Sequence, residues 1–116
     1  MLRGVARRLG GNCRPYDAVG RYGGEEFLVV APGCDAGQVL GLAERLRIAV
    51  AAEAIELPEA LLDITMSFGV TSFTPGSGVA AEALLRTADE ALYRAKHEGR
   101  NRVRVAESPQ RLAAAS

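Results

Sequence analysis

The chain has 116 residues, 48% of them hydrophobic, and its 14 basic and 14 acidic side chains cancel to a formal net charge of zero. This length suits one compact domain with its own core, and the balanced charge excludes the broad positive surface that binds nucleic acid or an anionic membrane. We therefore expect no nucleic-acid partner and no membrane contact by this segment. No stretch reaches the roughly 20 apolar residues of a membrane span, and the widely spaced Cys13 and Cys34 favour reduced thiols in a cytoplasm.

Hydrophobic periodicity and turn residues predict alternating helices and strands. In chain order they are a helix over residues 1–9, strands over 18–22 and 26–31, a helix over 35–53, a strand over 63–73, a helix over 77–98 and a strand over 102–105. Gly23-Gly24 permits the positive backbone angles of a tight turn and is expected to join the first two strands as a hairpin. Asp35, with Gln38 three residues later, is a typical N-cap, and Ser77 and Gly99 are expected to start and end the last helix.

This order of elements fits an α+β fold in which helices pack on a mostly antiparallel sheet. The sequence contains no internal repeat. Residues 106–116 are small and polar without periodicity, so we expect them to form a C-terminal tail behind a domain that spans residues 1–105.

The tetrapeptide Gly23-Gly24-Glu25-Glu26 has a composition suited to binding phosphates. Glycines at a turn let a large ligand reach the backbone N–H groups, and a neighbouring carboxylate can hold Mg²⁺ against phosphate oxygens. Taken alone, the same four residues are more typical of an ordinary turn with a solvated acidic tip.

Three longer motifs occur in order along the chain. The first is Arg21-Tyr22-Gly23-Gly24-Glu25-Glu26-Phe27, the second Thr65-Met66-Ser67-Phe68-Gly69-Val70, and the third runs from Ala88 to Lys96 and on to Gly99-Arg100-Asn101. Together they resemble the GGDEF-domain diguanylate cyclase family, in its variant with Glu at the third signature position. The resemblance extends over nearly everything from Leu2 to Val105.

The resemblance implies a nucleotide-cyclase or ferredoxin-like core that lacks its first strand and helix, so that the chain is the rear two-thirds of the domain, truncated at its N-terminus. In the family the front section supplies another metal-binding Asp and polar residues that read the guanine base. No segment of this chain matches that section. Loss of a central strand would also leave two strand edges open to pairing with another chain.

The same resemblance assigns roles at the signature turn and at the end of the last helix. It implies that Glu25 is a ligand of Mg²⁺ or Mn²⁺ and activates the attacking hydroxyl, that Glu26 is the second catalytic acid, and that Gly23-Gly24 gives the triphosphate close access to the backbone. Lys96 and Arg100 match the basic pair that contacts the triphosphate. On residue chemistry alone, basic side chains at a helix C-terminus are also favoured by the helix dipole without any ligand.

The implied reaction joins two GTP molecules into cyclic di-GMP and releases pyrophosphate. Because one site holds one GTP, a homodimer of domains is implied, and no Ser, Cys or His nucleophile is needed. We expect His97 to be a surface residue. A regulatory domain is expected outside this chain, and the location is expected to be the cytoplasm, either free or as the cytoplasmic part of a membrane-attached protein.

A further motif, Arg14-Pro15-Tyr16-Asp17, is separated from Gly23 by five residues and resembles the family's RxxD inhibitory motif. Arg14 and Asp17 would then bind the product cyclic di-GMP, because Arg can fork onto phosphate or guanine and Asp can accept from guanine N–H groups. Arg45 on the following helix is a further candidate contact. The alternative is an ordinary turn with a surface ion pair, and a solvated helix face for Arg45.

Two functions remain open from the sequence. The first is a Mg²⁺-dependent cyclase that acts as a dimer of domains. The second is a catalytically incomplete module that senses GTP or cyclic di-GMP without turnover, since the front section has no counterpart here. A fragment without activity is the third possibility.

Overall fold

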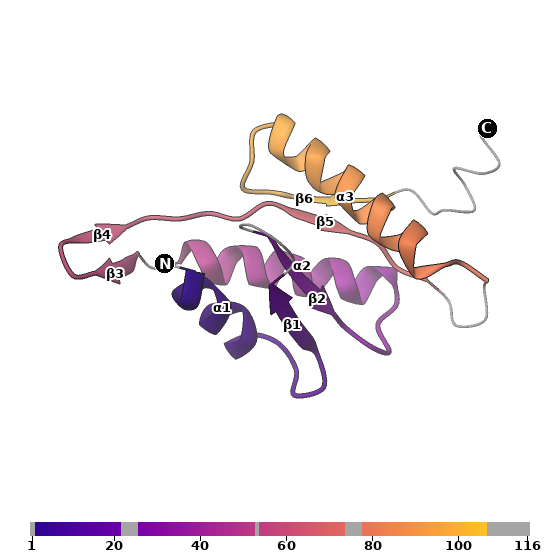
Figure 1. The fold of residues 1–116 in the computed structure, drawn as a ribbon, viewed down its shortest axis with the longest axis horizontal. Helices are drawn as coiled ribbons and strands as arrows, with labels where there is room; N and C mark the ends of the chain where they lie inside the picture. The colour runs from indigo at the N-terminus through magenta and orange to yellow at the C-terminus, as the bar shows by residue number, and fades with distance from the viewer. Residues whose placement is uncertain (1, 22–25, 53, 74–77, 107–116) are drawn as a thin grey trace.

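The computed structural model describes residues 2–21, 26–52, 54–73 and 78–106. Its elements, in chain order, are α1 (Leu2–Gly11), β1 (Ala18–Arg21), β2 (Phe27–Val30), α2 (Ala36–Ala51), β3 (Ile55–Leu57), β4 (Ala60–Leu62), β5 (Phe68–Val70), α3 (Ala81–His97) and β6 (Val103–Val105), as labelled in Figure 1. In the part of the chain so described, no helix combines the length and hydrophobicity that crossing a bilayer requires.

The strands form three separate pairs. β1 pairs antiparallel with β2, β3 pairs antiparallel with β4, and β5 pairs parallel with β6. The mixture of helices with mainly antiparallel strand pairs confirms the α+β class. Within the described residues no hydrogen-bonded ladder joins β2 to β5, although both strands lie beside α2.

Helix α2 organises the core. Its side chains Leu42, Leu46 and Val50 are buried together with Val5 and Leu9 of α1. Apolar residues from β1, β2 and β5 pack around this cluster, and they include Val19, Phe27, Val29 and Phe68. The helix begins as the sequence predicts, because the Asp35 side chain accepts from the Gln38 backbone and the Gln38 side chain accepts from the Asp35 backbone.

Helix α3 covers the β5–β6 pair on the side away from α2 (Figure 1). The close approach depends on Gly69 at the centre of β5. A Cβ atom at this position would overlap the carbonyl oxygen of Ala88 and the backbone nitrogen of Leu92. Phe68 and Val70, which alternate with Gly69 along the strand, pack toward α2. Packing therefore explains Phe68-Gly69-Val70, the end of the second sequence motif.

Three features differ from the sequence prediction. The β3–β4 hairpin was not expected, and Pro58 lies in its turn. The strand predicted over residues 63–73 is restricted to Phe68–Val70, since only these residues pair with β6. Ser77 lies outside the described residues, and the N-cap of α3 is Ala80, which forms no side-chain capping bond.

Candidate nucleotide site

The signature motif lies at the β1–β2 hairpin. The pairing register runs from Ala18 opposite Val30 to Arg21 opposite Phe27, which confirms the predicted hairpin. Glu26 is half-buried and immediately precedes β2. Tyr22, Gly23, Gly24 and Glu25 lie outside the described residues, so the roles assigned to Gly23, Gly24 and Glu25 stay predictions.

The two basic candidates lie at the end of α3 and just beyond it. Lys96 is half-buried in the last turn of the helix, and Arg100 is exposed in the connection to β6. Across the described residues, neither side chain takes part in a hydrogen bond or an ion pair. Both cations are therefore uncompensated by the neighbours that the structure describes, as a site for an anionic ligand requires. Their distance from the signature turn stays a prediction.

Among the described residues, no group of three or more His, Cys, Asp or Glu side chains is close enough to hold a metal ion. Mg²⁺ at phosphoryl-transfer sites is usually held by one or two carboxylates, with phosphate oxygens and water completing its shell. The carboxylates of Glu25 and Glu26 match that chemistry.

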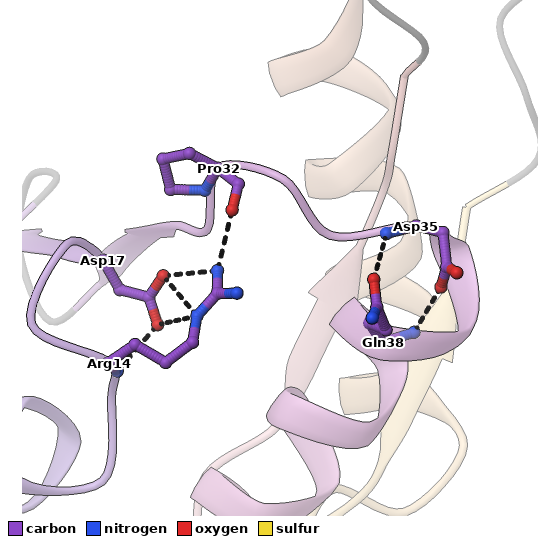
Figure 2. A network of polar contacts seen from close by, with 5 residues as sticks. All are labelled: Arg14, Asp17, Pro32, Asp35 and Gln38. Carbon is purple, nitrogen blue, oxygen red and sulfur yellow. Dashed lines mark hydrogen bonds and ion pairs between the residues drawn. The ribbon is translucent and has the colours of Figure 1, made fainter.

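The Arg14-Pro15-Tyr16-Asp17 turn forms a closed polar unit, which we call the RPYD corner. Figure 2 shows the guanidinium of Arg14 forked against the carboxylate of Asp17, with Nη2 to Oδ1 at 2.7 Å and Nε to Oδ2 at 3.1 Å. The Arg14 backbone N–H also donates to Asp17, at 2.8 Å. On its other side Nη2 donates to the carbonyl oxygen of Pro32, at 2.9 Å. The corner thus ties the start of β1 to the loop that leads into α2.

The electrostatics of the corner follow from these contacts. The hydrogen bonds from Arg14 hold the pKa of Asp17 below its usual range, and the charges of Arg14 and Arg45 lower it further. The same bonds raise the pKa of Arg14. The charge of Arg45 on α2 therefore reaches Asp17, while its predicted contact with the ligand stays a prediction.

Burial distinguishes the two partners of this ion pair. The Asp17 side chain has no exposed surface, whereas 29% of the Arg14 side chain is exposed. Tyr16 is exposed and its ring lies against the Arg14 guanidinium, 4.4 Å from the ring centroid to Cζ. In this conformation the Arg14 side chain is accessible to a ligand and the Asp17 side chain is not. Asp17 therefore orients Arg14 through its hydrogen bonds. The Arg14–Asp17 ion pair is therefore more buried than the surface pair that an ordinary turn would contain.

His97 is exposed, as expected, and stacks on Tyr93 with ring centroids 3.8 Å apart. The sequence reasoning missed one contact near Arg100. Arg47 of α2 donates from Nη1 to Asn101 Oδ1, at 3.0 Å, across 54 residues of sequence. The only signal for this contact in the sequence was that the third motif includes Asn101.

Comparison with known proteins identifies the family of this chain. The family model described as "Diguanylate cyclase, GGDEF domain" matches residues 1–102. The chain belongs to the GGDEF family of diguanylate cyclases. This confirms the resemblance that the three motifs indicate, and with it the kind of domain in which the signature hairpin occurs.

Relatives and solved structures within the GGDEF family agree with this assignment. The response regulator PleD of Caulobacter vibrioides is 43% identical over 105 residues, which are 89% of this chain and 23% of PleD. The GGDEF domain of DgcB from Caulobacter crescentus, solved in complex with c-di-GMP, superposes with a TM-score of 0.81 at 35% identity, covering 92% of this chain and 63% of that one. The active GGEEF domain of a diguanylate cyclase from Vibrio cholerae gives 0.78 at 30% identity, covering 92% and 68%.

The chain therefore spans about a quarter of the length of PleD and about two-thirds of these solved GGDEF chains. Family and fold are fixed by these matches. The reaction, the metal and the individual site residues of this chain are matters for proposal.

Proposed function

We propose that residues 1–105 are the rear two-thirds of a GGDEF domain that condenses two GTP into cyclic di-GMP, with residues 106–116 as a C-terminal tail. The observation that carries the proposal is the family match over residues 1–102, which contains the uninterrupted signature between two paired strands. Within the described residues, one edge of β2 and one edge of β5 have no strand partner, and this supports the proposal too, because one further strand between them, from a segment outside this chain, would complete a single sheet.

In this proposal the chain contributes positioning and charge rather than a covalent intermediate. Each GTP 3′-hydroxyl attacks the α-phosphate of the other nucleotide, and pyrophosphate leaves. Gly23 and Gly24 admit the triphosphate to the backbone of the turn, and Glu25 accepts the proton of the attacking hydroxyl, with Glu26 beside it. Lys96 and Arg100 neutralise the phosphates. Because each domain holds one GTP, two domains face each other as a homodimer.

Mg²⁺ or Mn²⁺ would be held by Glu25, together with the phosphates of the nucleotide. When bound, such an ion polarises phosphoryl oxygens and orients the triphosphate. Lys96 and Arg100, which have no ion-pair partner among the described residues, neutralise the remaining negative charge of the phosphates. We further propose that a regulatory domain outside this chain sets the activity and that the domain works in the cytoplasm.

The RPYD corner is proposed to bind the product cyclic di-GMP and to inhibit the enzyme. Arg14 and Arg45 offer guanidinium groups to phosphate or guanine, while Asp17 fixes the orientation of Arg14 from behind. The product complex of the DgcB GGDEF domain supports cyclic di-GMP as the ligand class.

A second candidate function is a sensor that binds cyclic di-GMP or GTP without turnover. The observation in its favour is that the corner is fully assembled within the described residues, with Arg14 already held in place. Product formation separates the two functions, because a sensor binds cyclic di-GMP through Arg14 but makes none.

The decisive experiment substitutes Glu25→Ala in the full-length protein and measures cyclic di-GMP formed from GTP and Mg²⁺ by chromatography. We expect activity to fall by about 100-fold or more, as removal of a group that acts in the transition state does, with an unchanged circular dichroism spectrum. Glu56→Ala, at an exposed acid of the β3–β4 hairpin, is the matched control and should keep full activity. Full turnover by Glu25→Ala would remove that residue from its proposed part.

A further inference from the structure

The connection between α3 and β6 has an unusual backbone. Three successive residues have positive φ, with Gly99 at 130°, Arg100 at 62° and Asn101 at 46°. Glycine adopts such angles freely and asparagine is tolerated there, but arginine has no local compensation for its Cβ. Arg100 is therefore the strained residue of the turn. Backbone strain of this kind persists only where surrounding contacts enforce it, and it concentrates at functional sites.

The backbone of Arg100 is fixed from both sides. Its N–H donates to the Ala95 carbonyl, at 2.9 Å, and its own carbonyl accepts from Arg102 Nε, at 3.0 Å. The connection is also bonded to the sheet, because the backbone N–H of Phe68 in β5 donates to the Arg102 carbonyl. All these bonds hold the main chain, which leaves the exposed Arg100 side chain to a ligand.

One contact to this turn comes from another element. Arg47 Nη1 donates to Asn101 Oδ1 at 3.0 Å, while Arg47 Nε and Nη2 donate to Glu44 at 3.2 and 2.9 Å. Glu44 lies one helical turn earlier on α2, so it aims the guanidinium and compensates its charge. The Arg47 side chain is 23% exposed. Helix α2 thus holds Asn101 through an arginine that donates from all three of its side-chain nitrogens.

We propose that Arg47 is a positioning residue for the nucleotide site, holding the Arg100–Asn101 turn in the strained conformation that presents Arg100 to the triphosphate. This inference rests on the proposed function, in which Arg100 contacts that triphosphate. Arg47 itself does not meet the nucleotide. Its effect on catalysis passes through Asn101 and the backbone of Arg100.

A double-mutant cycle in the full-length protein tests the inference. Arg47→Met keeps the length and apolar stem of the side chain and removes its donors. We expect kcat/KM for GTP to fall between about 10- and 100-fold, chiefly through a higher KM, because small displacements of a positioned group have effects of this size. In an Arg100→Ala background the same substitution should change kcat/KM less than twofold, since its only target is gone. Arg47→Lys, which retains a donor for Asn101, should recover part of the loss.

Two controls keep the outcome interpretable. Arg7→Met removes an exposed arginine from α1 and should leave kcat/KM unchanged. If Arg47→Met fails to fold, Asn101→Gly takes its place in the cycle, because glycine accepts the left-handed backbone but offers Arg47 no acceptor.

The possible failures are distinct. Wild-type kcat/KM in Arg100→Ala would overturn the proposed role of Arg100 and hence the proposed site. A loss in Arg100→Ala combined with an unaffected Arg47→Met would overturn only the positioning role. An equal loss from Arg47→Met with and without Arg100 would show that Arg47 acts by stabilising the fold, and would overturn the positioning role as well.

Discussion

The RPYD corner and the α3–β6 turn orient their arginines in opposite ways. At the corner, Arg14 is engaged by a carboxylate, a carbonyl and an aromatic ring, and no backbone strain is needed. At the turn, the Arg100 side chain has no partner among the described residues, while its backbone is held at a φ of 62°. The corner orients a side chain with polar contacts, and the turn orients one through the main chain.

This difference fits the two proposed tasks. A regulatory site gains from a charge that is already aimed before the ligand arrives, because less side-chain freedom is lost on binding. A catalytic cation must neutralise the negative charge of the substrate phosphates. An ion pair with a carboxylate of the protein would compete with the substrate for that cation. Mutations that affect the RPYD corner or the α3–β6 turn alone can therefore test whether the two regions have separate tasks.

The largest effect is expected from Gly69→Ala. The new methyl group would overlap the backbone of α3 at Ala88 and Leu92, so the helix must shift and carry Lys96 and Arg100 with it. We expect a loss of about 1 to 3 kcal/mol in the free energy of unfolding, measured by urea denaturation, together with reduced cyclase activity. Affinity of the folded protein for cyclic di-GMP should be retained, since the corner does not touch α3.

Gly20→Ala is the matched control, because nothing lies within 4 Å of a Cβ built at that strand position. Its unfolding free energy should stay within about 0.5 kcal/mol of the original. Equal stabilities of the two variants would contradict the close packing of α3 on β5.

A smaller effect is expected at the corner. Arg14→Ala should weaken binding of cyclic di-GMP by about tenfold or more, measured by calorimetry on the full-length protein, because a charged and oriented donor is lost. Catalysis in the absence of product should be unchanged. Asp17→Ala should also weaken binding, since Arg14 would then lose the carboxylate that orients it.

Arg7→Ala, at an exposed arginine of α1, controls for the loss of one positive charge and should bind normally. Identical affinities of Arg14→Ala and the unaltered protein would return the RPYD corner to the class of ordinary structural turns.

The sequence predicted the elements whose causes are local. The Asp35 and Gln38 capping box, the signature hairpin and the stop of α3 just before Gly99 all depend on residues close together in the chain. What it missed depends on distant contacts. The extent of β5 is set by its pairing with β6, and the contact of Arg47 with Asn101 joins residues 54 positions apart.

The candidate site divides in the same way. The motifs gave the residue types, and the spacing of Arg14 and Asp17 gave an i,i+3 pair. No periodicity could reveal that Asp17 has no exposed surface, or that Arg14 donates to the Pro32 carbonyl 18 residues away, because both depend on how distant parts of the chain fold together. Likewise, a left-handed arginine cannot be recognised from its sequence neighbours alone, since its backbone is held by contacts with Ala95 of α3 and with Arg102, and Arg47 of α2 holds the adjacent Asn101.

The smallest expected effect concerns strain at the turn, and its sign is informative. At an ordinary helical position, replacing alanine by glycine costs about 1 kcal/mol. At Arg100, with φ at 62°, the Cβ atom itself is unfavourable by about 1 to 2 kcal/mol, so Arg100→Gly should be more stable than Arg100→Ala by up to about 1 kcal/mol. Urea denaturation of both variants measures the difference, and both should lose cyclase activity because the guanidinium is absent. The pair Glu90→Gly and Glu90→Ala, on the exposed face of α3, should show the opposite order. If glycine were the less stable residue at both positions, the turn would hold no strain, and the contrast with the RPYD corner would reduce to a difference in side-chain partners.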